Sequence, residues 1–548
     1  MTTARELADD YWDFRKQTNH FAGLMRGDLT YIERWNDLSA GGTLAAVAQY
    51  ESFAAQARAL ETDDLTSRVL AATVAASATT DALTYAAQAE LLAPNMQMGI
   101  ISWLLPGIVV QPLVTADHGA RYLQKLDALE LFVNQLIDRL REGVRSGRVP
   151  LARHAIDTAT KLTTLLDDPD SPFSQQAPPI EFTPQDAEEW TAEVAERVDR
   201  VVKPALRRLV AELTTTTVPA GRPDDRPGLL HLDGGAELYR RLVGAHTTLD
   251  VAPEHVHAVG LAQVARLEEE YLSLAGPLLG TTQIEEIYLR LRTDDSLHHH
   301  DADEIIADAL RAFEKAQAAM GDWFGVLPRA DCVASATEVG ALAYYRTPSE
   351  DGTQPGHFFF NTSEPSMWAT FQVAAIAYHE GIPGHHLQLA LGMENENVHP
   401  LHRHLYLPGF GEGWGLYTER LADEMGLYED DWERVGMLFA DSLRACRLVV
   451  DTGMHALGWT RQQAIDYMVA HSPMAVYEVE QEIDRYIGAP GQATSYMMGR
   501  LEIDKIRSEA ETELGQGFDV KAFHDAVLSF GTVPLPVLRE IVSARLGY

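Results

Sequence analysis

A nearly apolar helix that ends in a broken, histidine-rich segment constrains this chain more than any other feature. The segment is AYHEGIPGHHLQ at residues 377–388, and the residues before it, MWATFQVAAIA, are typical of a helix buried on most sides. Burying His379 and Glu380 at the end of such a helix costs free energy unless these side chains are paired or bind a cation. The segment therefore predicts either a metal site or a helix end with two capping histidines.

The spacing of the histidines departs from the zinc-protease pattern, in which a second His follows the first by four residues. Here Pro383 occupies the fourth position, and His385 is six residues after His379, about 9 Å along a regular helix. Zinc–nitrogen bonds of about 2.0–2.1 Å do not span that distance. Glycine tolerates unusual dihedrals and proline lacks an amide donor, so the sequence predicts a helix that bulges or resets here.

A second stretch, PGFGEGWGLYTERLADEMGLY at 408–428, strengthens the metal interpretation. It places Glu412 at the start of an apolar-periodic helix, among glycines that allow close approach. A zinc site with two histidines needs a third, anionic ligand and an open position for water. Alone, Glu412 is equally well explained as a glutamate favoured by the helix dipole. Together with the histidine segment it predicts a metal site.

Three motifs together resemble the bacterial family known as domain of unknown function 885 (DUF885). They are His-Glu-x-x-Pro-Gly-His-His-x-Gln, Glu-Gly-Trp, and a final Pro-Gly-Gln-Ala-x-x-Tyr, which here reads PGQATSYMMG at 490–499. The best matches cover residues 341–500. The first two stretches are also similar to gluzincin-type zinc metallopeptidases, in which a His-Glu helix is followed by a glutamate ligand on a second helix.

The resemblance implies one Zn²⁺ ion, although manganese or cobalt suits similar ligands. Its ligands would be His379, Glu412 and either His385 or His386, with His385 favoured because Gly384-His385 aligns with a Gly-His of oligopeptidases. Glu380, beside the first ligand, would be the general base for a zinc-bound water. His386 would then support the oxyanion or a ligand.

Other candidates have a structural alternative. Tyr496 could donate to a tetrahedral oxyanion, or it could be a core tyrosine with a bonded hydroxyl. Arg500 could bind a substrate carboxylate, or form an ion pair. Arg447, Asp451 and His455 form, with Arg444, a polar stripe on one apolar helix. Asp451 could orient a ligand histidine, His455 or an arginine could hold substrate charge, or the stripe could be a buried salt-bridge network.

Residues 341–362 are the one region that reads as β structure. ALAYYRTP and HFFFNT are short and aromatic, and the turn formers SEDGTQPG join them, so a hairpin or small sheet is expected beside the metal-bearing helix. Tyr344, Tyr345 and Asn361 lie in it, where an edge strand could pair with an extended peptide. Ordinary sheet packing is the alternative.

The rest of the chain predicts a mainly α fold. Ala and Leu recur at helical spacing up to about residue 168, and a helix is expected to start at Thr183, with Pro184 in its first turn. Residues 98–114, MGIISWLLPGIVVQPLV, read as a buried helix and turn. The expected organisation is an N-terminal helical part, 1–218, and a C-terminal metal-bearing part, 219–548, on either side of a deep, gluzincin-like cleft.

Charge limits the binding partners of this chain, and its cysteine content limits the kinds of metal site and disulfide it can form. The formal net charge is −36, from 44 basic and 80 acidic residues, so the surface repels nucleic acid and anionic membrane. Two cysteines, Cys332 and Cys446, form no CxxC pair, which excludes thiolate zinc sites and makes a disulfide framework unexpected. The charged N-terminus lacks the apolar core of a signal peptide, and a cytoplasmic location is expected.

The function expected from these features is zinc-dependent hydrolysis of an amide bond, most simply in a short peptide. Two alternatives stay open: a zinc-dependent hydrolase or lyase of a non-peptide small molecule, and a helical scaffold with a structural metal or none. The sequence does not define the peptide end attacked, the side-chain preference or the oligomeric state.

Overall fold

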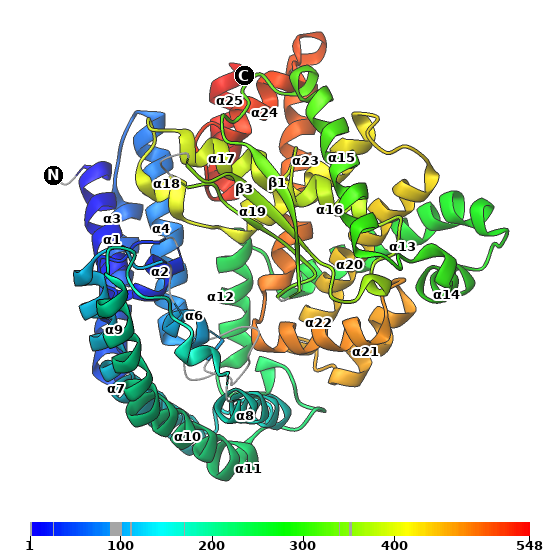
Figure 1. Cartoon of the computed structure of the whole chain (residues 1–548). Helices are drawn as coiled ribbons and strands as arrows, with labels where there is room; N and C mark the ends of the chain where they lie inside the picture. The colour runs from blue at the N-terminus through cyan, green and yellow to red at the C-terminus, as the bar shows by residue number, and fades with distance from the viewer. Residues whose placement is uncertain are drawn as a thin grey trace.

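The structure, a computed structural model of the whole chain, describes residues 3–25, 27–87, 101–102, 104–109, 112–168, 170–338, 340–349 and 353–548. Helices joined by turns and loops make up the described part of the blue-to-green half of the chain in Figure 1. Its α-helices are α1 (Ala4–Thr18), α2 (His20–Met25), α3 (Ala40–Ala59), α4 (Leu65–Ala86), α6 (Leu104–Ile108), α7 (Ala116–Ser146), α8 (Ala152–Asp167), α9 (Pro184–Arg197), α10 (Lys203–Glu212) and α11 (Val218–Ala220).

The helix expected at Thr183 begins there because its first turn satisfies its own amide groups. The Thr183 hydroxyl accepts from the Asp186 amide, and the Asp186 carboxylate accepts from the Thr183 amide. This capping box is followed by a long curved rod, visible at the lower left of Figure 1, in which α9, α10 and α11 are joined by two π-helical segments. These segments are η2 (Val198–Val202) and η3 (Leu213–Thr217).

The second half of the chain contains the predicted site. Its α-helices are α12 (Gly235–Thr247), α13 (Pro253–Leu279), α14 (Ile284–Thr293), α15 (Ala302–Trp323), α16 (Val373–Glu380), α17 (His385–Glu394), α18 (Pro400–His404), α19 (Pro408–Glu424), α20 (Asp431–His455), α21 (Arg461–Ala470), α22 (Val476–Gly488), α23 (Ser495–Leu514), α24 (Val520–Leu528) and α25 (Leu535–Leu546). Short 3₁₀ turns complete the chain: η1 (Pro172–Ser174), η4 (Leu229–His231), η5 (Asp295–Leu297), η6 (Pro365–Met367), η7 (Gln492–Thr494) and η8 (Gly515–Gly517).

The described residues form one small sheet, which confirms the expected hairpin and adds a strand. β2 (Ala343–Arg346) and β3 (Gly356–Asn361) are antiparallel, with Tyr345 opposite Phe358. The added strand, β1 (Cys332–Thr337), pairs in parallel with β3, so the order is β1-β3-β2. Phe358 is fully buried and stacks on Phe313 of α15, which fixes one face of the sheet against the helices.

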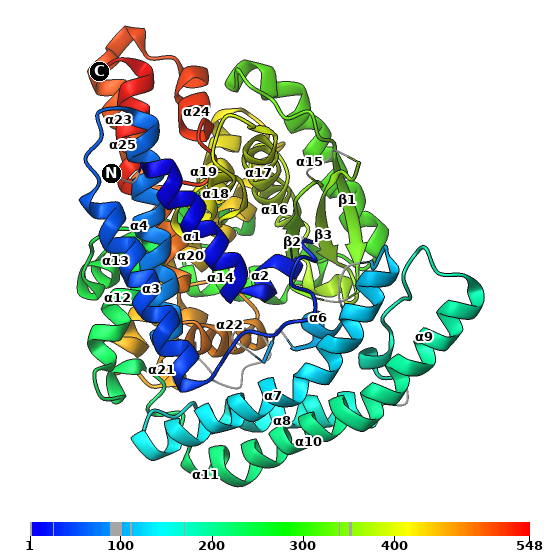
Figure 2. The same ribbon diagram turned by 90° about the vertical axis from the view of Figure 1, so that its left-hand side faces the viewer.

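Three apolar cores hold these elements. One is built from residues between 24 and 213, and the largest is built almost entirely from residues after 229. The third joins α1, α3 and α4 to Leu401 and Leu405 of the second half. Figure 2 faces these N-terminal helices, with α7 and α10 running beneath them. The boundary predicted at residue 218 stays a prediction, and the two parts it separates share this third core.

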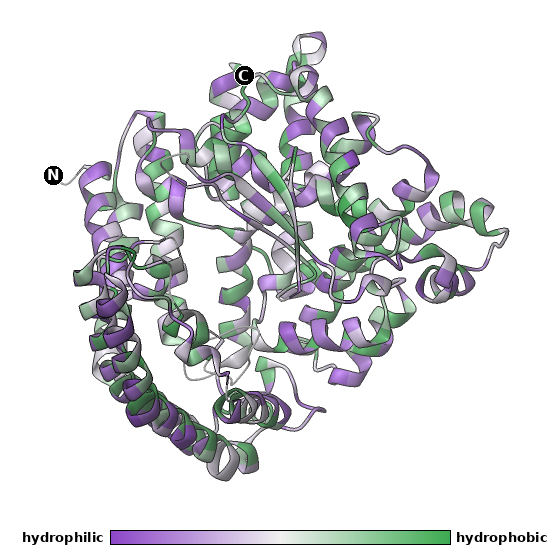
Figure 3. Cartoon of the chain, viewed as in Figure 1, coloured by the Kyte–Doolittle hydropathy of each residue, from purple (hydrophilic) through white to green (hydrophobic). Residues whose placement is uncertain are grey.

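Hydropathy follows the same arrangement. In Figure 3 the green, apolar residues concentrate on α16, β3 and the neighbouring helices of the second half, whereas purple residues dominate the outer rod. Within the described ranges, no helix is both long and apolar enough to cross a membrane. The apolar run predicted as a buried helix and turn, residues 98–114, lies partly outside the described residues; its described part includes α6.

Candidate metal centre

The broken segment turns a sharp corner between two helices. α16 ends at Glu380 and α17 begins at His385, so the helix resets rather than bulges. A side-chain carbon at Gly384 would lie 1.9 Å from the His379 carbonyl oxygen, so only glycine fits this corner. The indole N–H of Trp414 donates to the Pro383 carbonyl at 3.0 Å and ties the corner to α19. The corner brings a later histidine back beside His379.

Helix α19 supplies the carboxylate. It starts with a proline at its first position, as a helix tolerates, and Glu412 follows within the next turn. Gly413 of α19 lies so close to Gly499 of α23 that an added Cβ would come within 2.6 Å of backbone atoms. Gly409 and Gly499 meet in the same way. This glycine seam, Gly409–Gly413–Gly499, holds the helix of Glu412 against the helix of Tyr496.

The corner and α19 bring His379, His385 and Glu412 together. Glu412 Oε2 lies 3.6 Å from His379 Nε2 and 3.6 Å from His385 Nε2, and one ligand atom of each residue lies within 4.8 Å of the other two. These separations are too long for hydrogen bonds. They are close to the roughly 3.4 Å between two ligands of a tetrahedral ion bound at about 2.0–2.1 Å. The donor set therefore fits a divalent cation such as zinc.

His379 lies across helix α19 between two carboxylates. Its Nδ1–H donates to Glu419 Oε1 at 2.7 Å, while its Nε2 faces Glu412. The ring passes over Gly415, where an added Cβ would meet the ring at 2.6 Å. Glu412, Gly415 and Glu419 are spaced by three and four residues, so they form one stripe on α19. Glu419 fixes the orientation of the ring, with Nε2 turned toward Glu412.

Glu419 was not predicted from the sequence. It lies in the stretch at 408–428 that also contains Glu412, and it is completely buried. The available signal was its position seven residues after Glu412, which places both carboxylates on the same face of a helix. Its link to His379 connects residues 40 apart in the chain, which local spacing does not reveal.

The charged side chains of the cluster shift one another's pKa values. Burial opposes a charge on His379, but the Glu412 and Glu419 carboxylates outweigh it and raise the pKa of His379 to about 9. Burial alone would raise the pKa of Glu412, but His379 and His385 hold that pKa well below its usual range. Three side chains thus share a buried region that favours Glu412 as an anion. His385 Nδ1 is buried without a hydrogen-bond partner among the described residues.

His386 points away from this cluster. Its Nε2–H donates to the Ala330 carbonyl at 3.1 Å, and its Nδ1 accepts from the Tyr345 hydroxyl at 2.8 Å. Burial lowers the pKa of His386 to about 4, so the ring is neutral at pH 7. Of the two neighbouring histidines, the structure places His385 in the cluster. Tyr345, considered for substrate binding, lies behind His386 instead.

Glu380 and Tyr496 lie at the cluster with unused polar atoms. Glu380 is half-buried and forms no hydrogen bond or ion pair with any described residue, and the Tyr496 hydroxyl has no hydrogen-bond partner in the described parts of the chain. Burial and the Glu412 carboxylate raise the pKa of Tyr496, so its hydroxyl keeps its proton at pH 7. Tyr406, which was not predicted, donates to Glu412 Oε1 at 2.6 Å and is 44% exposed.

The expectations for His455 and Asp451 need correction. His455 Nδ1 accepts from the Leu229 amide and its Nε2–H donates to the Tyr486 carbonyl, so neither nitrogen is available for substrate. Asp451 accepts from the Tyr239 hydroxyl at 2.6 Å and from the Gly491 amide, and it orients no ligand histidine. Both residues hold helices together.

Two arginines considered for substrate binding are paired with carboxylates inside the protein. Arg500 forms a 2.5 Å ion pair with Asp441, which is completely buried, so the expected surface ion pair is an internal one. Arg447 contacts Glu482 at 2.8 Å, and its guanidinium carbon lies 4.5 Å from the centre of the Tyr496 ring. Arg500 is therefore a structural residue, whereas Arg447 borders the cluster.

The hairpin residues Asn361 and Tyr344 are not brought to the cluster. The side-chain N–H of Asn361 donates to the Gly340 carbonyl, and its side-chain oxygen accepts from Ser363. The side chain therefore shapes the turn after β3. Tyr344 stacks on Phe359 of the neighbouring strand at 4.8 Å. These contacts correspond to the alternative of ordinary sheet packing. Pairing of an edge strand with a peptide remains a prediction.

Comparison with known families gives one decisive match. The family described as "Bacterial protein of unknown function (DUF885)" matches residues 18–542. The chain belongs to the DUF885 family. Its description assigns no activity.

The fold of this DUF885 protein recurs in solved structures. A putative lipoprotein from Colwellia psychrerythraea is 24% identical, with a TM-score of 0.89 over 100% of both chains. A putative lipoprotein of unknown function from Shewanella oneidensis is 15% identical, with a TM-score of 0.76 over 99% of this chain and 100% of the other. These likenesses show the fold. The curated proteins give no match.

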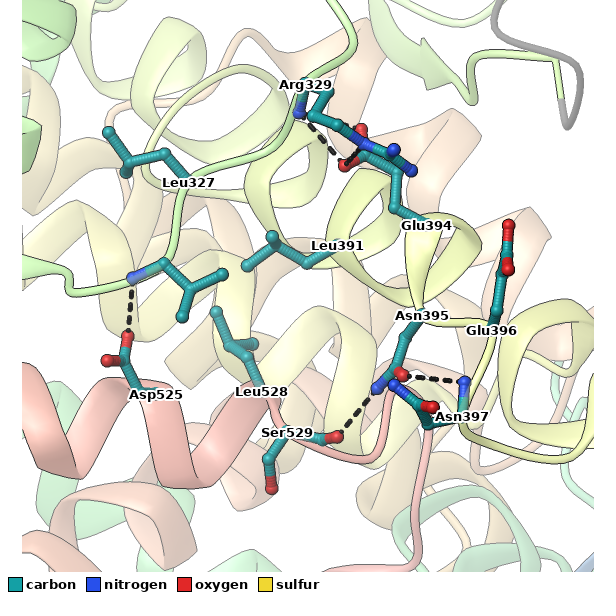
Figure 4. Close-up of a pocket in the computed structure, with 11 residues that line it drawn as sticks. Leu327, Arg329, Leu391, Glu394, Asn395, Glu396, Asn397, Asp525, Leu528 and Ser529 are labelled. Atoms are coloured by element: carbon teal, nitrogen blue, oxygen red, sulfur yellow. Dashed lines mark hydrogen bonds and ion pairs between the residues drawn. The ribbon is translucent and has the colours of Figure 1, made fainter.

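A separate surface pocket of this DUF885 protein lies at the far end of α17 (Figure 4). The pocket encloses about 630 Å³ and combines an apolar floor with a polar rim. Leu327, Leu391 and Leu528 lie near its centre, while Glu394 binds Arg329 at the edge. Glu394 ends the helix that His385 begins, about 13 Å away along the axis. The metal cluster does not line this pocket, and the expected deep cleft remains a prediction.

Proposed function

We propose that this DUF885 protein is a zinc-dependent hydrolase of amide bonds in short peptides, with a gluzincin-like site. The observation that carries the proposal is the meeting of His379, His385 and Glu412 beside an unpaired Glu380. Three ligands from two imidazoles and a carboxylate, with a carboxylate to spare, are the composition of a catalytic zinc site.

Zinc bound by these three residues would supply Lewis acidity and lower the pKa of a water molecule toward about 7. Glu419 would hold the His379 ring so that Nε2 faces the ion. Tyr406 would hold the Glu412 carboxylate through its outer oxygen, leaving Oε2 toward the ion. Glu419 and Tyr406 would thus orient two of the three ligands.

Two residues would act on the substrate. Glu380 would accept a proton from the attacking water and deliver it to the leaving amine, because its carboxylate has no other partner among the described residues. The Tyr496 hydroxyl would donate to the oxygen of the substrate carbonyl as negative charge develops there. His386 is held by Tyr345 and Ala330, so it would support the wall of the site rather than meet the substrate.

The composition of the cluster argues against a structural metal. Structural zinc sites are closed by four protein ligands, whereas the cluster in the described residues offers three. Hydrolysis of a non-peptide amide would use the same groups. A panel that includes short peptides and N-acylated small molecules separates the two substrate classes.

The test compares metal content and hydrolysis in the wild type and in Glu380→Gln. We expect about one zinc ion per chain in both proteins, and a loss of kcat/KM of about 10²–10⁴-fold in the variant, because only the proton acceptor is removed. Glu396→Gln, which changes an exposed glutamate, is the matched control. Equal rates in wild type and Glu380→Gln would remove this mechanism.

A further inference from the structure

Two buried arginines lie beside the proposed centre in a chain whose net charge is −36. Arg444 and Arg447 of α20 are each only 7% exposed. The Tyr496 ring faces both of them, with guanidinium carbons 5.9 and 4.5 Å from its centre. Residues three apart lie on one face of a helix, so both guanidinium groups point toward α23. Tyr496 therefore separates the cluster from a region of positive charge.

The internal contacts of these arginines leave N–H groups unused. Arg447 donates from Nε and Nη2 to Glu482, and from Nε to the Tyr486 hydroxyl, while its Nη1 has no acceptor among the described residues. Arg444 donates from Nη1 to the Ala440 carbonyl. Its Nε is buried without an acceptor in the described structure. Leaving such donors unpaired costs free energy, so the arrangement is poised for a further acceptor.

The positive charge is only partly neutralised. Glu482 is shared between Arg447 and Arg485, and both contacts are 3.0 Å or shorter at their closest. Arg444 Nη2 lies 3.6 Å from Glu419 Oε1, beyond hydrogen-bond length, and that oxygen already accepts from His379. Three arginines thus face two carboxylates, one of which is committed to the metal ligand. An anion would restore the balance.

The same contacts locate this region next to the reacting atoms. Arg444 is linked to His379 through a single residue, Glu419. The Glu412 carboxylate helps to raise the pKa of Tyr496 and the nearby arginines oppose it, so charges of both signs lie near its hydroxyl. A substrate held at the centre would therefore extend along the Tyr496 ring toward the guanidinium groups.

We infer that Arg444 and Arg447, with Tyr496 as a wall, form a subsite for a free carboxylate of the substrate. The inference rests on the proposed function and names its substrate class: amides that carry a carboxylate within a few bonds of the bond that is cut. Arginine suits this task because its planar donors match a carboxylate. The carboxylate can come from a peptide C-terminus or from an acidic side chain.

The first test uses wild-type, zinc-loaded protein and one short peptide in two forms, with a free C-terminal acid or a C-terminal amide. We expect kcat/KM for the acid to be at least about 100-fold higher, because the amide leaves buried charged donors unpaired. A third peptide, amidated but ending in aspartate, distinguishes the two sources: cleavage at the rate of the acid assigns the subsite to a side chain. Equal cleavage of all three overturns the subsite.

Substitutions of Arg444 and Arg447 test whether these two residues bind the carboxylate. In Arg447→Lys and Arg444→Lys the acid-to-amide ratio is expected to fall at least about tenfold, because a lysine keeps the charge but loses the fork geometry. Arg461→Lys is the matched control: Arg461 is buried and paired with Asp484 at 2.8 Å outside the cluster, so its ratio should stay at the wild-type value. An unchanged ratio in both α20 variants would contradict the assignment.

A binding measurement separates the subsite from the hydrolysis. Calorimetry compares succinate with succinamate on the zinc-loaded wild type, where one carboxylate can meet the ion and only succinate has a second. We expect succinate to bind at least about tenfold more tightly, and the difference to vanish in Arg447→Lys. Discrimination without peptide cleavage would refute the proposed hydrolysis and support the subsite. Peptide cleavage without discrimination would refute the subsite alone.

Discussion

His385 and His386 are neighbours in the chain with opposite surroundings. The imidazole of His385 faces Glu412, whereas both nitrogens of His386 are taken by Tyr345 and Ala330. This contrast at the first turn of α17 provides an internal test of the metal assignment, because the two residues share helix, burial and chemistry.

We expect His385→Ala to lower zinc affinity by more than about 100-fold, the upper end of what losing an outer partner costs. His386→Ala should retain zinc within about tenfold of the wild type, and should lower thermal stability by leaving two polar partners unsatisfied. Competition with a metal-sensitive chelator measures both affinities. The opposite order would show that the ligand is His386.

Among single residues, the candidate metal ligands were easier to predict from the sequence than the residues that only hold the structure together. His379, His385 and Glu412 stand in motifs whose chemistry is readable, because histidines and a glutamate on apolar helices need a partner. Asp451 and His455 were left with two interpretations because a polar stripe on an apolar helix has the same pattern in a buried ion network as in a site. Which partner each one meets depends on helices far away in the chain.

At the scale of the helix, the packing of α19 against His379 depends on Gly415, which has no side chain. Glu412 and Glu419 grip the His379 ring over Gly415, and the ring occupies the space that a Cβ would need. A methyl group there must displace the imidazole or the whole of α16. The geometry of the three candidate ligands is thus set by a residue that is not one of them.

We expect Gly415→Ala to abolish zinc binding or weaken it by at least about 100-fold, although alanine is the better helix former by about 1 kcal/mol. Gly321→Ala in α15 is the control, because nothing lies within 4 Å of its added Cβ and the residue is exposed. It should keep its zinc and melt at the same or a slightly higher temperature. Normal zinc content in Gly415→Ala would show that α16 can move.

Whether an element could be predicted depended on how much of its signal is local. The start of α9 was predictable because Thr183 and Asp186 form a capping box within one turn. The hairpin was predictable from its aromatic residues and turn formers. Strand β1, CVASAT, has neither signal, and it is a strand because β3 lies beside it. The reset of the helix between α16 and α17 was one of two options that proline and glycine allow.

On the scale of the whole molecule, Asp451 joins parts that the chain separates widely. It receives hydrogen bonds from Tyr239 of α12 and from Gly491 before η7, and it sits in the middle of the core. Burial raises the pKa of Asp451 from 3.8 to about 7, against the hydrogen bonds from Tyr239 and Gly491. Its ionisation therefore acts on the stability of the entire second half.

The sign of this effect follows from proton binding. Between pH 3.8 and about 7 the folded state holds a proton on Asp451 that the unfolded state has lost, so rising pH destabilises the fold through this group. Above about pH 7 both states are ionised and the contribution stays constant. Asparagine, which does not titrate, lacks this dependence.

We expect Asp451→Asn to gain stability relative to the wild type as the pH rises from 5 to 7, by up to a few kcal/mol at about 1.4 kcal/mol per unit, and no further at pH 8. Thermal unfolding of both proteins without metal across this range measures the gap. Asp466→Asn, at an exposed position on α21, should show no gap that changes with pH. A constant gap for Asp451→Asn would show that Asp451 has an ordinary pKa.

The mainly helical class was readable from periodicity, but the way the halves meet was not. Leu401 and Leu405 enter a core made otherwise of α1, α3 and α4, hundreds of residues earlier. Neither segment has a sequence feature that predicts its contact with the other. The prediction of two parts divided at residue 218 stays open for the same reason.

The glycine seam between α19 and α23 has a consequence for inheritance. An extra carbon at Gly413 or Gly499 would push α19 and α23 apart, and one at Gly409 would collide with Thr247, so a substitution at any of the three glycines displaces the helix of Glu412. We therefore expect substitutions to be tolerated less well at these three positions than at the exposed positions of the outer rod.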